Sequence, residues 1–468
     1  MKPFFSLLVV LALACESNPK RDTPNVTPTT PANQVSTTKR TVAKAFFTEL
    51  RAGNYQRAVD SYFSAAMRKR MNAERLQRVW DALIKRAGAL QHLESIREQP
   101  YGHFHLVFFR CAFERAVYEV QITIDRQKQV AGLFYRDPKP ASRPTKTKSP
   151  PTFAPPPYAQ PKTFHEQPMS IGSAPWVLPA TLSLPKSARP ARGFPALVLV
   201  HESHPHDRDE TIGSNKPFRD LAWGLASRGI AVLRYEKRTK THAKAMAERI
   251  DTFTVKEETI DDALAAVAAL RQNKAIDQQH IVILGHGLGG SVLPRIARRD
   301  TKIAAFIALG ASSRPLEDVV LERVAAITKS SGEPHSHAKH LLEKLQAKVA
   351  RVKSKGLSAK IPNKLLPLGL PASYWLDLRA HPFTRFAARI AQPILFLQGG
   401  RDYQVTKADL EGWKKAMKGK QNARYVTLDK ANHLLIEGEG PSTPAEYHKP
   451  GHVSVRAIDT ITHFITTL

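Results

Sequence analysis

Apolar residues follow first a helical and then an alternating spacing in the N-terminal part of the chain. They recur with helical periodicity between Val42 and Ile84, and from His92 the period shifts towards two. Three later segments predict strands: residues 104–113, 117–124 and 130–135. Helices followed by a meander of strands predict a small α+β domain over residues 39–137.

Apolar runs alternate with helical patterns from about residue 163 to the end of the chain. Seven runs predict strands: residues 176–184, 196–200, 230–233, 281–284, 304–309, 393–397 and 423–428. Five segments predict helices: residues 218–227, 257–271, 291–299, 407–417 and 453–464. Strands alternating with helices predict a second, larger α/β domain over residues 163–468, with a mostly parallel sheet covered on both faces.

One connection in this second part is too long to be a plain loop. About eighty residues separate the strand that ends at Leu309 from the strand that begins at Pro393. Within this insertion, residues 336–355 predict an amphipathic helix with many lysines on its polar face, and Gly356 is placed to end it. Solvation explains the lysine face, and a membrane-surface role is the alternative.

The segments outside the two domains predict export and flexible connections. Residues 4–14 form an apolar run that is too short to span a bilayer and has the size of a signal-peptide core. The run ends in Ala-Leu-Ala-Cys, which resembles a bacterial lipoprotein processing site with residues 1–15 as the signal and Cys15 as the lipidated residue. An ordinary secretory signal is the alternative. Residues 16–38 predict a flexible tether and residues 138–162 a proline-rich linker.

Composition and charge indicate which partners and which cellular setting to expect for the protein. An apolar fraction of 42% suffices for real cores, and the net charge of +29 favours an anionic setting. The charge is spread along the chain without a compact basic and aromatic motif, so a solvated basic surface is favoured and no nucleic acid is expected. An anionic envelope surface is the alternative partner. The two cysteines are Cys15 and Cys111. If Cys15 carries lipid, no disulfide forms, and Cys111, within an apolar run, is expected to be a core residue.

A glycine-rich turn follows the strand at residues 281–284. The sequence Gly-His-Gly-Leu-Gly at residues 285–289 resembles the elbow G-x-S-x-G, in which a serine nucleophile stands between a strand and a helix. The flanking glycines are present, and Gly287 replaces the serine. Glycine has no oxygen with which to attack an acyl carbon.

About the last three hundred residues resemble α/β-hydrolases of a bacterial esterase-like or peptidase-like branch. Besides the elbow, the resemblance is carried by His201 with the sequence Asp-Arg-Asp-Glu-Thr at residues 207–211, and by Tyr-Trp-Leu-Asp-Leu at residues 374–378. It implies an α/β-hydrolase fold with a helical lid at about residues 311–390. It also implies hydrolysis of carboxylic esters or similar acyl bonds, without a cofactor or a metal. By layout and position, the first domain resembles the nuclear transport factor 2-like domains that precede secreted α/β-hydrolases.

The same resemblance implies the acid and the base of a catalytic triad. Asp402 follows a buried strand, where the family keeps its acid, and His433 follows the last strand, where the family keeps its histidine. A helix-capping aspartate and a surface histidine are the alternatives. The oxyanion hole would use the backbone N–H of Leu288 and the loop around Glu202 and Ser203. A carboxylate at Glu202 would repel an oxyanion if it pointed inwards.

Two parts of the implied catalytic machinery are altered, the nucleophile position at Gly287 and the oxyanion loop at Glu202. These changes favour a catalytically impaired, ligand-binding member of the family, with a small ester or acyl molecule as its partner. One alternative is an active ester hydrolase that uses Ser203 or Ser291, or residual chemistry of Asp402 and His433. A second alternative, of another class, is a metal-dependent site. Its candidate ligands are His201, His204 and His206.

The cysteine after the apolar run gives a direct test of export and anchoring. If Cys15 is lipidated, the wild-type protein should partition with membranes, and Cys15→Ser should release it or block its processing. Fractionation of cells followed by immunoblotting measures this. A Cys15→Ser protein that fractionates like the wild type would exclude the lipoprotein hypothesis.

Overall fold

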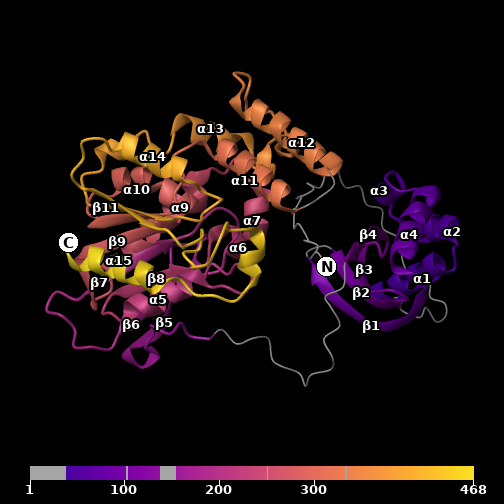
Figure 1. The fold of residues 1–468 in the computed structure, drawn as a ribbon, viewed down its shortest axis with the longest axis horizontal. Helices are drawn as coiled ribbons and strands as arrows, with labels where there is room; N and C mark the ends of the chain where they lie inside the picture. The colour runs from indigo at the N-terminus through magenta and orange to yellow at the C-terminus, as the bar shows by residue number, and fades with distance from the viewer. Residues whose placement is uncertain (1–37, 102–103, 137–153, 250, 332–334) are drawn as a thin grey trace, which may run out of the picture. The chain divides into compact units, whose positions relative to one another are not determined.

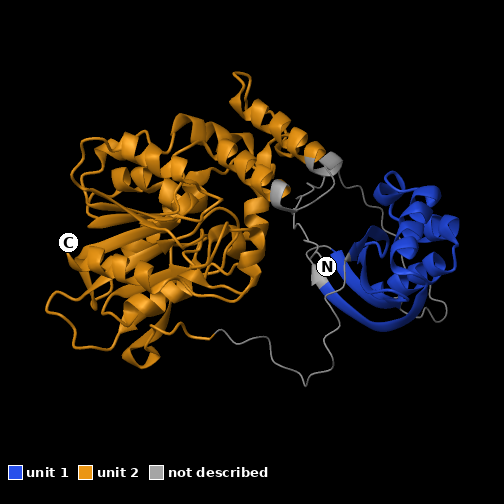
Figure 2. Cartoon of the chain, viewed as in Figure 1, with its two compact units in different colours: residues 1–8, 17–152 blue, residues 9–16, 153–468 orange. Residues whose placement is uncertain are grey.

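The computed structural model describes residues 38–101, 104–136, 154–249, 251–331 and 335–468. The chain divides into two compact units (Figure 2): residues 1–8 with 17–152, and residues 9–16 with 153–468. The predicted signal segment, Cys15, almost all of the tether and most of the proline-rich linker lie outside the described residues. Among the described residues, no helix combines the length and the apolarity that are needed to span a membrane.

The first unit packs helices on one four-stranded antiparallel sheet of order β1-β2-β3-β4 (Figure 1). Its elements are α1 (Lys39–Arg51), α2 (Tyr55–Tyr62), α3 (Ala65–Arg68), α4 (Ala73–Ala87), β1 (Leu90–Tyr101), β2 (Phe104–Phe113), β3 (Val117–Ile124) and β4 (Val130–Arg136). Asn72 caps α4 by accepting from the Arg75 N–H, and Phe47 of α1 stacks on Phe109 of β2 at 4.5 Å between ring centroids. The predicted α+β layout is confirmed, and Cys111 is buried in the core.

The second unit contains a mostly parallel sheet of order β12-β11-β10-β9-β7-β8-β6-β5. Its strands are β5 (Phe164–Ile171), β6 (Leu178–Pro185), β7 (Phe194–Val200), β8 (Ala231–Tyr235), β9 (Ile276–His286), β10 (Ala305–Leu309), β11 (Ile394–Gly399) and β12 (Ala423–Leu428). The strands from β8 through β7 to β12 pair in parallel, whereas β5 and β6 add antiparallel strands at one end. All seven predicted strands are present, and β5 is an additional edge strand.

Helices cover both faces of this sheet, as the alternation of strands and helices predicts. Their bounds are α5 (Pro217–Ala226), α6 (Arg238–Thr241), α7 (Ala243–Glu248), α8 (Asp261–Arg271), α9 (Leu288–Ser291), α10 (Leu293–Arg299), α14 (Lys407–Ala416) and α15 (Val455–Thr466). Because side chains alternate along a strand, β7 contributes to two cores. Leu197 and Leu199 pack with α5 and α15, while Val198 and Val200 pack with α8 and α10. The α/β-hydrolase fold predicted from the sequence is therefore confirmed.

The described part of the long connection between β10 and β11 contains the α-helices α11 (Leu316–Ser331), α12 (His335–Lys353) and α13 (Ala372–Ala380) (Figure 1). It also contains the short 3-10 helices η3 (Asn363–Leu365), η4 (Pro367–Gly369) and η5 (Ala387–Arg389). Val352 of α12 is fully buried in the same core as α8. Arg295 of α10 pairs with Asp377 of α13 through two contacts of 2.7 and 3.0 Å. The insertion is thus fastened to the core of this unit by packing and to α10 by a two-contact ion pair, and its role as a lid stays a prediction.

The glycines that flank the elbow are needed for close approach of backbones. A Cβ on Gly289 would clash with Val200 O and lie 2.7 Å from His201 O, so α9 could no longer pack against the end of β7. We expect Gly289→Ala to lower the free energy of unfolding by about 1–3 kcal/mol. Urea denaturation measures the change.

Gly356→Ala is the control, because its nearest contact would be Ser354 Oγ at 3.8 Å. Equal stabilities of the two alanine variants would contradict this view of the elbow.

Candidate active site

The backbone of the elbow keeps the conformation of a nucleophile turn although the serine is absent. β9 ends at His286, and α9 begins at Leu288. Between them Gly287 has φ +51° and ψ −114°, in the left-handed region that favours glycine. A residue with a Cβ would be strained there. Gly287 therefore relieves strain and leaves no side chain at the position where the resemblance places the nucleophile.

The structure brings Asp402 and His433 together from two strand ends. Asp402 follows β11, and its Oδ1 accepts the N–H groups of Gln404 and Val405 at 2.8 and 3.0 Å. Its Oδ2 lies 2.6 Å from His433 Nδ1, in the loop after β12. Both side chains are buried. The pair has the geometry in which a carboxylate orients a histidine for proton transfer.

Glu202 occupies the space beside the other nitrogen of this histidine. Its Oε2 lies 3.6 Å from His433 Nε2, where a serine hydroxyl would stand in a complete triad. A Cβ added to Gly287 would lie 2.8 Å from Glu202 Cβ and 3.4 Å from Glu202 Oε2. Glu202 therefore points inwards, against the base and over Gly287.

The main chain of Glu202 is held on both sides. Its N–H donates to Glu210 Oε1 at 2.9 Å, and its carbonyl accepts from Lys237 Nζ at 2.6 Å. Glu210 Oε2 in turn lies 2.7 Å from His286 Nδ1. The Glu202 N–H, expected to be an oxyanion donor, is thus already bonded to a carboxylate. The Leu288 N–H lies in the first turn of α9, where backbone N–H groups lack an intrahelical acceptor.

A chain of buried polar contacts links this loop to the insertion. Lys237 Nζ lies 2.7 Å from Glu258 Oε1, and Tyr374 of α13 donates its hydroxyl to Glu258 Oε2 at 2.6 Å. Glu210 lies in the motif at residues 207–211 that carries the family resemblance, but Lys237 and Glu258 belong to no motif of the sequence. Lysine and glutamate are usually solvated, so nothing in the sequence marks these as buried partners.

Charge around His433 decides its protonation. Burial alone lowers the pKa of His433, but the charge and hydrogen bond of Asp402, and then those of Glu202, raise it to about 10. Burial alone raises the pKa of Glu202, but His433 and the positive charge of Arg323 on α11 hold it well below its usual range. At neutral pH the site therefore holds an imidazolium between two carboxylates.

The remaining candidates are placed as follows. Ser203 Oγ lies 3.1 Å from His204 Nδ1 and is partly exposed. Ser291 is buried below the elbow and donates to Gly287 O at 3.1 Å, so it does not face the base.

The histidines of the metal alternative are bonded to backbone carbonyl groups. His201 Nε2 lies 3.0 Å from Asp207 O, and His206 Nε2 lies 2.8 Å from Ser203 O. The described residues contain no group of three or more histidine, cysteine or acidic side chains arranged to hold a metal ion, so the metal alternative has no ligand set there.

Comparisons with known proteins extend over both units. The chain is 35% identical over 424 residues to Esterase EstD of Thermotoga maritima, which covers 90% of this chain and 93% of that esterase. Residues 43–133 match a family described as proteins of unknown function, DUF3887. Est1E from Butyrivibrio proteoclasticus has a TM-score of 0.41 at 17% identity, over 64% of this chain and 96% of that chain. A puromycin-hydrolyzing peptidase of Mycobacterium tuberculosis has a TM-score of 0.41 at 18% identity, over 81% of this chain and 48% of that chain.

The raised pKa of His433 predicts a pH dependence of stability. A histidine pKa raised from 6.5 to about 10 contributes stability that is fully present below pH 6.5 and is lost as the pH rises towards 10. Glu202→Gln removes one of the two carboxylates, so the pKa of His433 should fall. The loss should then still begin near pH 6.5 but should end at a lower pH and be smaller. The free energy of unfolding in urea, measured from pH 6 to 10, follows this.

Glu411→Gln, which removes an exposed partner of Lys414, is the matched control and should keep the wild-type curve. Curves of one shape for all three proteins would show that Glu202 does not raise the pKa of His433.

Proposed function

This chain belongs to the esterase family of α/β-hydrolases, and from that premise we propose that it binds a small ester or acyl ligand and has lost efficient turnover. One observation carries the proposal: the Glu202 carboxylate lies over Gly287 and 3.6 Å from His433 Nε2. A carboxylate thus takes the place beside the base that the nucleophile takes in an active member.

Three steps of acyl transfer are affected. Gly287 offers no oxygen for attack, and in a serine hydrolase removal of the nucleophile lowers kcat by about 10⁶-fold. An imidazolium at His433 has no free nitrogen lone pair with which to accept a proton. The Glu202 N–H is bonded to Glu210, and loss of one oxyanion donor lowers kcat by about 10²–10³-fold. The three effects concern different groups, which supports a loss of catalysis over a single chance replacement.

Ligand binding is supported by what the site retains. Asp402 and His433 still form a hydrogen bond of 2.6 Å, and the insertion is joined to the Glu202 loop through Tyr374 and Glu258. His433 faces a carboxylate at each ring nitrogen, so the nearby Arg323 is the cation that would attract the carbonyl or carboxylate oxygen of an acyl compound.

Ser203 supports a second candidate function, an ester hydrolase with a relocated nucleophile. The contact of 3.1 Å between Ser203 Oγ and His204 Nδ1 is the kind of serine–histidine contact that activates a hydroxyl. Ser203 is partly exposed and lies beside Glu202, so a substrate in the family's pocket would be near it. A fluorophosphonate adduct on Ser203, located by mass spectrometry, would support this second function and contradict the binding proposal.

We also propose that the protein works in the bacterial cell envelope, anchored through Cys15 or secreted. The apolar run before Cys15 and the net charge of +29 support this location, because a basic protein is attracted to anionic envelope surfaces.

The reverse substitution tests the loss of turnover. Gly287→Ser alone should stay near the wild-type rate, because its Cβ would lie 2.8 Å from Glu202 Cβ and His433 would still be charged. The double variant Gly287→Ser with Glu202→Gly frees both the space and the base. We expect it to hydrolyse p-nitrophenyl esters at least about 10²-fold faster than the wild type, since it restores the step whose loss costs about 10⁶-fold.

Two further variants complete this experiment. Adding His433→Ala to the double variant should abolish its gain in esterase activity. The single variant Gly356→Ser is the control for the introduction of a serine elsewhere in the chain. High wild-type activity that His433→Ala removes would refute the proposal, because the unchanged site would then be a working hydrolase.

A further inference from the structure

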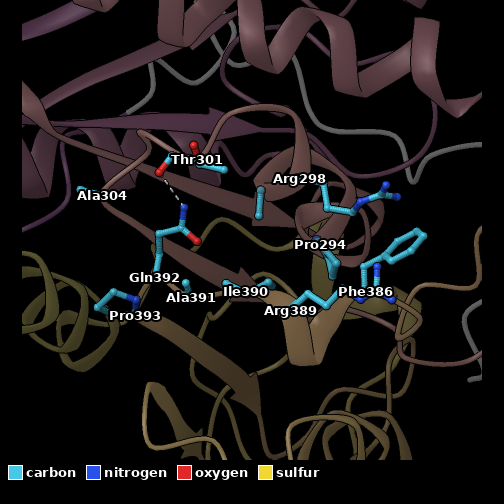
Figure 3. A pocket seen from close by; sticks show the side chains of 11 residues that line it. Pro294, Arg298, Thr301, Ala304, Phe386, Arg389, Ile390, Ala391, Gln392 and Pro393 are labelled. Atoms are coloured by element: carbon cyan, nitrogen blue, oxygen red, sulfur yellow. Dashed lines mark hydrogen bonds between the residues drawn. The ribbon is translucent and has the colours of Figure 1, made fainter.

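A concave site lies at the opposite end of the sheet from the elbow. A cavity of about 450 Å³ opens beside Ala304, which precedes β10, and Pro393, which precedes β11 (Figure 3). Because β9, β10 and β11 are parallel, this is the amino end of the strands, whereas Gly287 follows the carboxyl end of β9. The cavity is therefore separate from the Asp402 and His433 site.

The wall of this cavity is largely apolar, and its rim is polar. Pro294, Ala297, Ile390 and Pro393 line it together with the buried ring of Phe386. At the rim, Gln392 donates its amide to Thr301 O at 3.0 Å (Figure 3). A volume of 450 Å³ lies within the range of small-molecule sites.

Three arginines surround the Phe386 ring. The guanidinium carbons of Arg298, Arg385 and Arg389 lie 4.1, 5.4 and 5.8 Å from its centroid. Arg298 and Arg389 also line the cavity. Cation–π contact accounts for one guanidinium on such a ring, but several like charges around it repel each other.

The neighbouring carboxylates do not neutralise this cluster. Asp300 is held by Arg271 at 2.5 and 3.0 Å, and Asp377 is held by Arg295. Within the described ranges, no carboxylate forms an ion pair with Arg298, Arg385 or Arg389. The mouth of an apolar cavity thus carries uncompensated positive charge.

We propose that this cavity binds the headgroup of an anionic phospholipid. Its phosphate would lie between Arg298 and Arg389, whose planar guanidinium groups bind phosphate oxygens in a bidentate manner. The adjoining glycerol and first methylene groups would lie on the wall of Pro294, Ala297 and Ile390. Charge complementarity selects the phosphate, and the apolar wall selects an amphiphile over a free inorganic ion. The net charge of +29 further favours an anionic lipid surface.

Binding of a short-chain lipid to the full-length protein tests this. Dihexanoyl phosphatidylglycerol, kept below its micelle concentration, should bind by calorimetry, and dihexanoyl phosphatidylcholine should bind at least about tenfold more weakly, because its choline cation neutralises the phosphate and opposes the arginines. Arg298→Ala with Arg389→Ala should weaken phosphatidylglycerol binding by about tenfold or more, the loss expected for charged hydrogen bonds.

The matched control is Arg424→Ala with Arg456→Ala. It also removes two exposed arginines of the second unit, and Arg424 likewise lies over an aromatic ring, Phe464, at 5.7 Å. This control should bind the lipid like the wild type. Equal losses in both double variants, or no binding by the wild type, would overturn the proposal. Inorganic phosphate that binds as tightly as the lipid would also overturn it, in favour of a simple anion site.

A measurement on the unchanged protein covers the case in which the double variant does not fold. Phenylglyoxal modifies accessible arginines, and peptide mass spectrometry locates the adducts. Dihexanoyl phosphatidylglycerol should protect Arg298 and Arg389 and leave Arg424 reactive. Uniform reactivity with and without the lipid would refute the site.

Discussion

The candidate active site depends on one buried arrangement of charge, in which His433 lies between Asp402 and Glu202. Burial of a charged group is costly unless opposite charges compensate it, so each member of this set needs the others. Asp402 is the partner that an α/β-hydrolase keeps for orientation. Glu202 adds to the effect of Asp402, and together the two carboxylates raise the pKa of His433 to about 10, so that the imidazole is a cation at neutral pH.

The surroundings of Glu202 show that this arrangement is supported by the fold. Its backbone is fastened to Glu210 and Lys237, and through Glu258 this support reaches Tyr374 on the insertion. Removal of the nucleophile also relaxes the backbone, because a left-handed elbow suits glycine better than serine. Loss of the attacking group and gain of the carboxylate are therefore mutually consistent, since a side chain at residue 287 and Glu202 compete for one space.

Local patterns were sufficient for the fold and for the strand ends at which the candidate site residues lie. The buried strands of the second unit are apolar runs, and the elbow, Asp402 and His433 each follow such a run. Edge strands were harder to predict from the sequence. β5 is mostly exposed and contains Pro168. β1 forms one edge of its sheet and contains the charged residues Glu94, Arg97 and Glu98, so neither strand has a strong apolar pattern.

Interactions between distant residues account for the rest. The contact between Glu202 and His433 joins side chains that are more than two hundred positions apart in the chain. No local pattern of the sequence could therefore predict it. The buried partners Glu210, Lys237 and Glu258 are of residue types that are almost always solvated. The arginine cluster around Phe386 combines α10 with the segment before β11, and no single stretch of sequence contains both.

The central claim, that His433 is a cation held between two carboxylates, can be observed directly. Long-range correlations between ring protons and ¹⁵N nuclei distinguish a charged from a neutral imidazole, and His433→Ala assigns the signal. At pH 8, well below a pKa of about 10, both ring nitrogens of His433 should have the shifts of an imidazolium. A neutral tautomer of His433 at that pH would contradict the account.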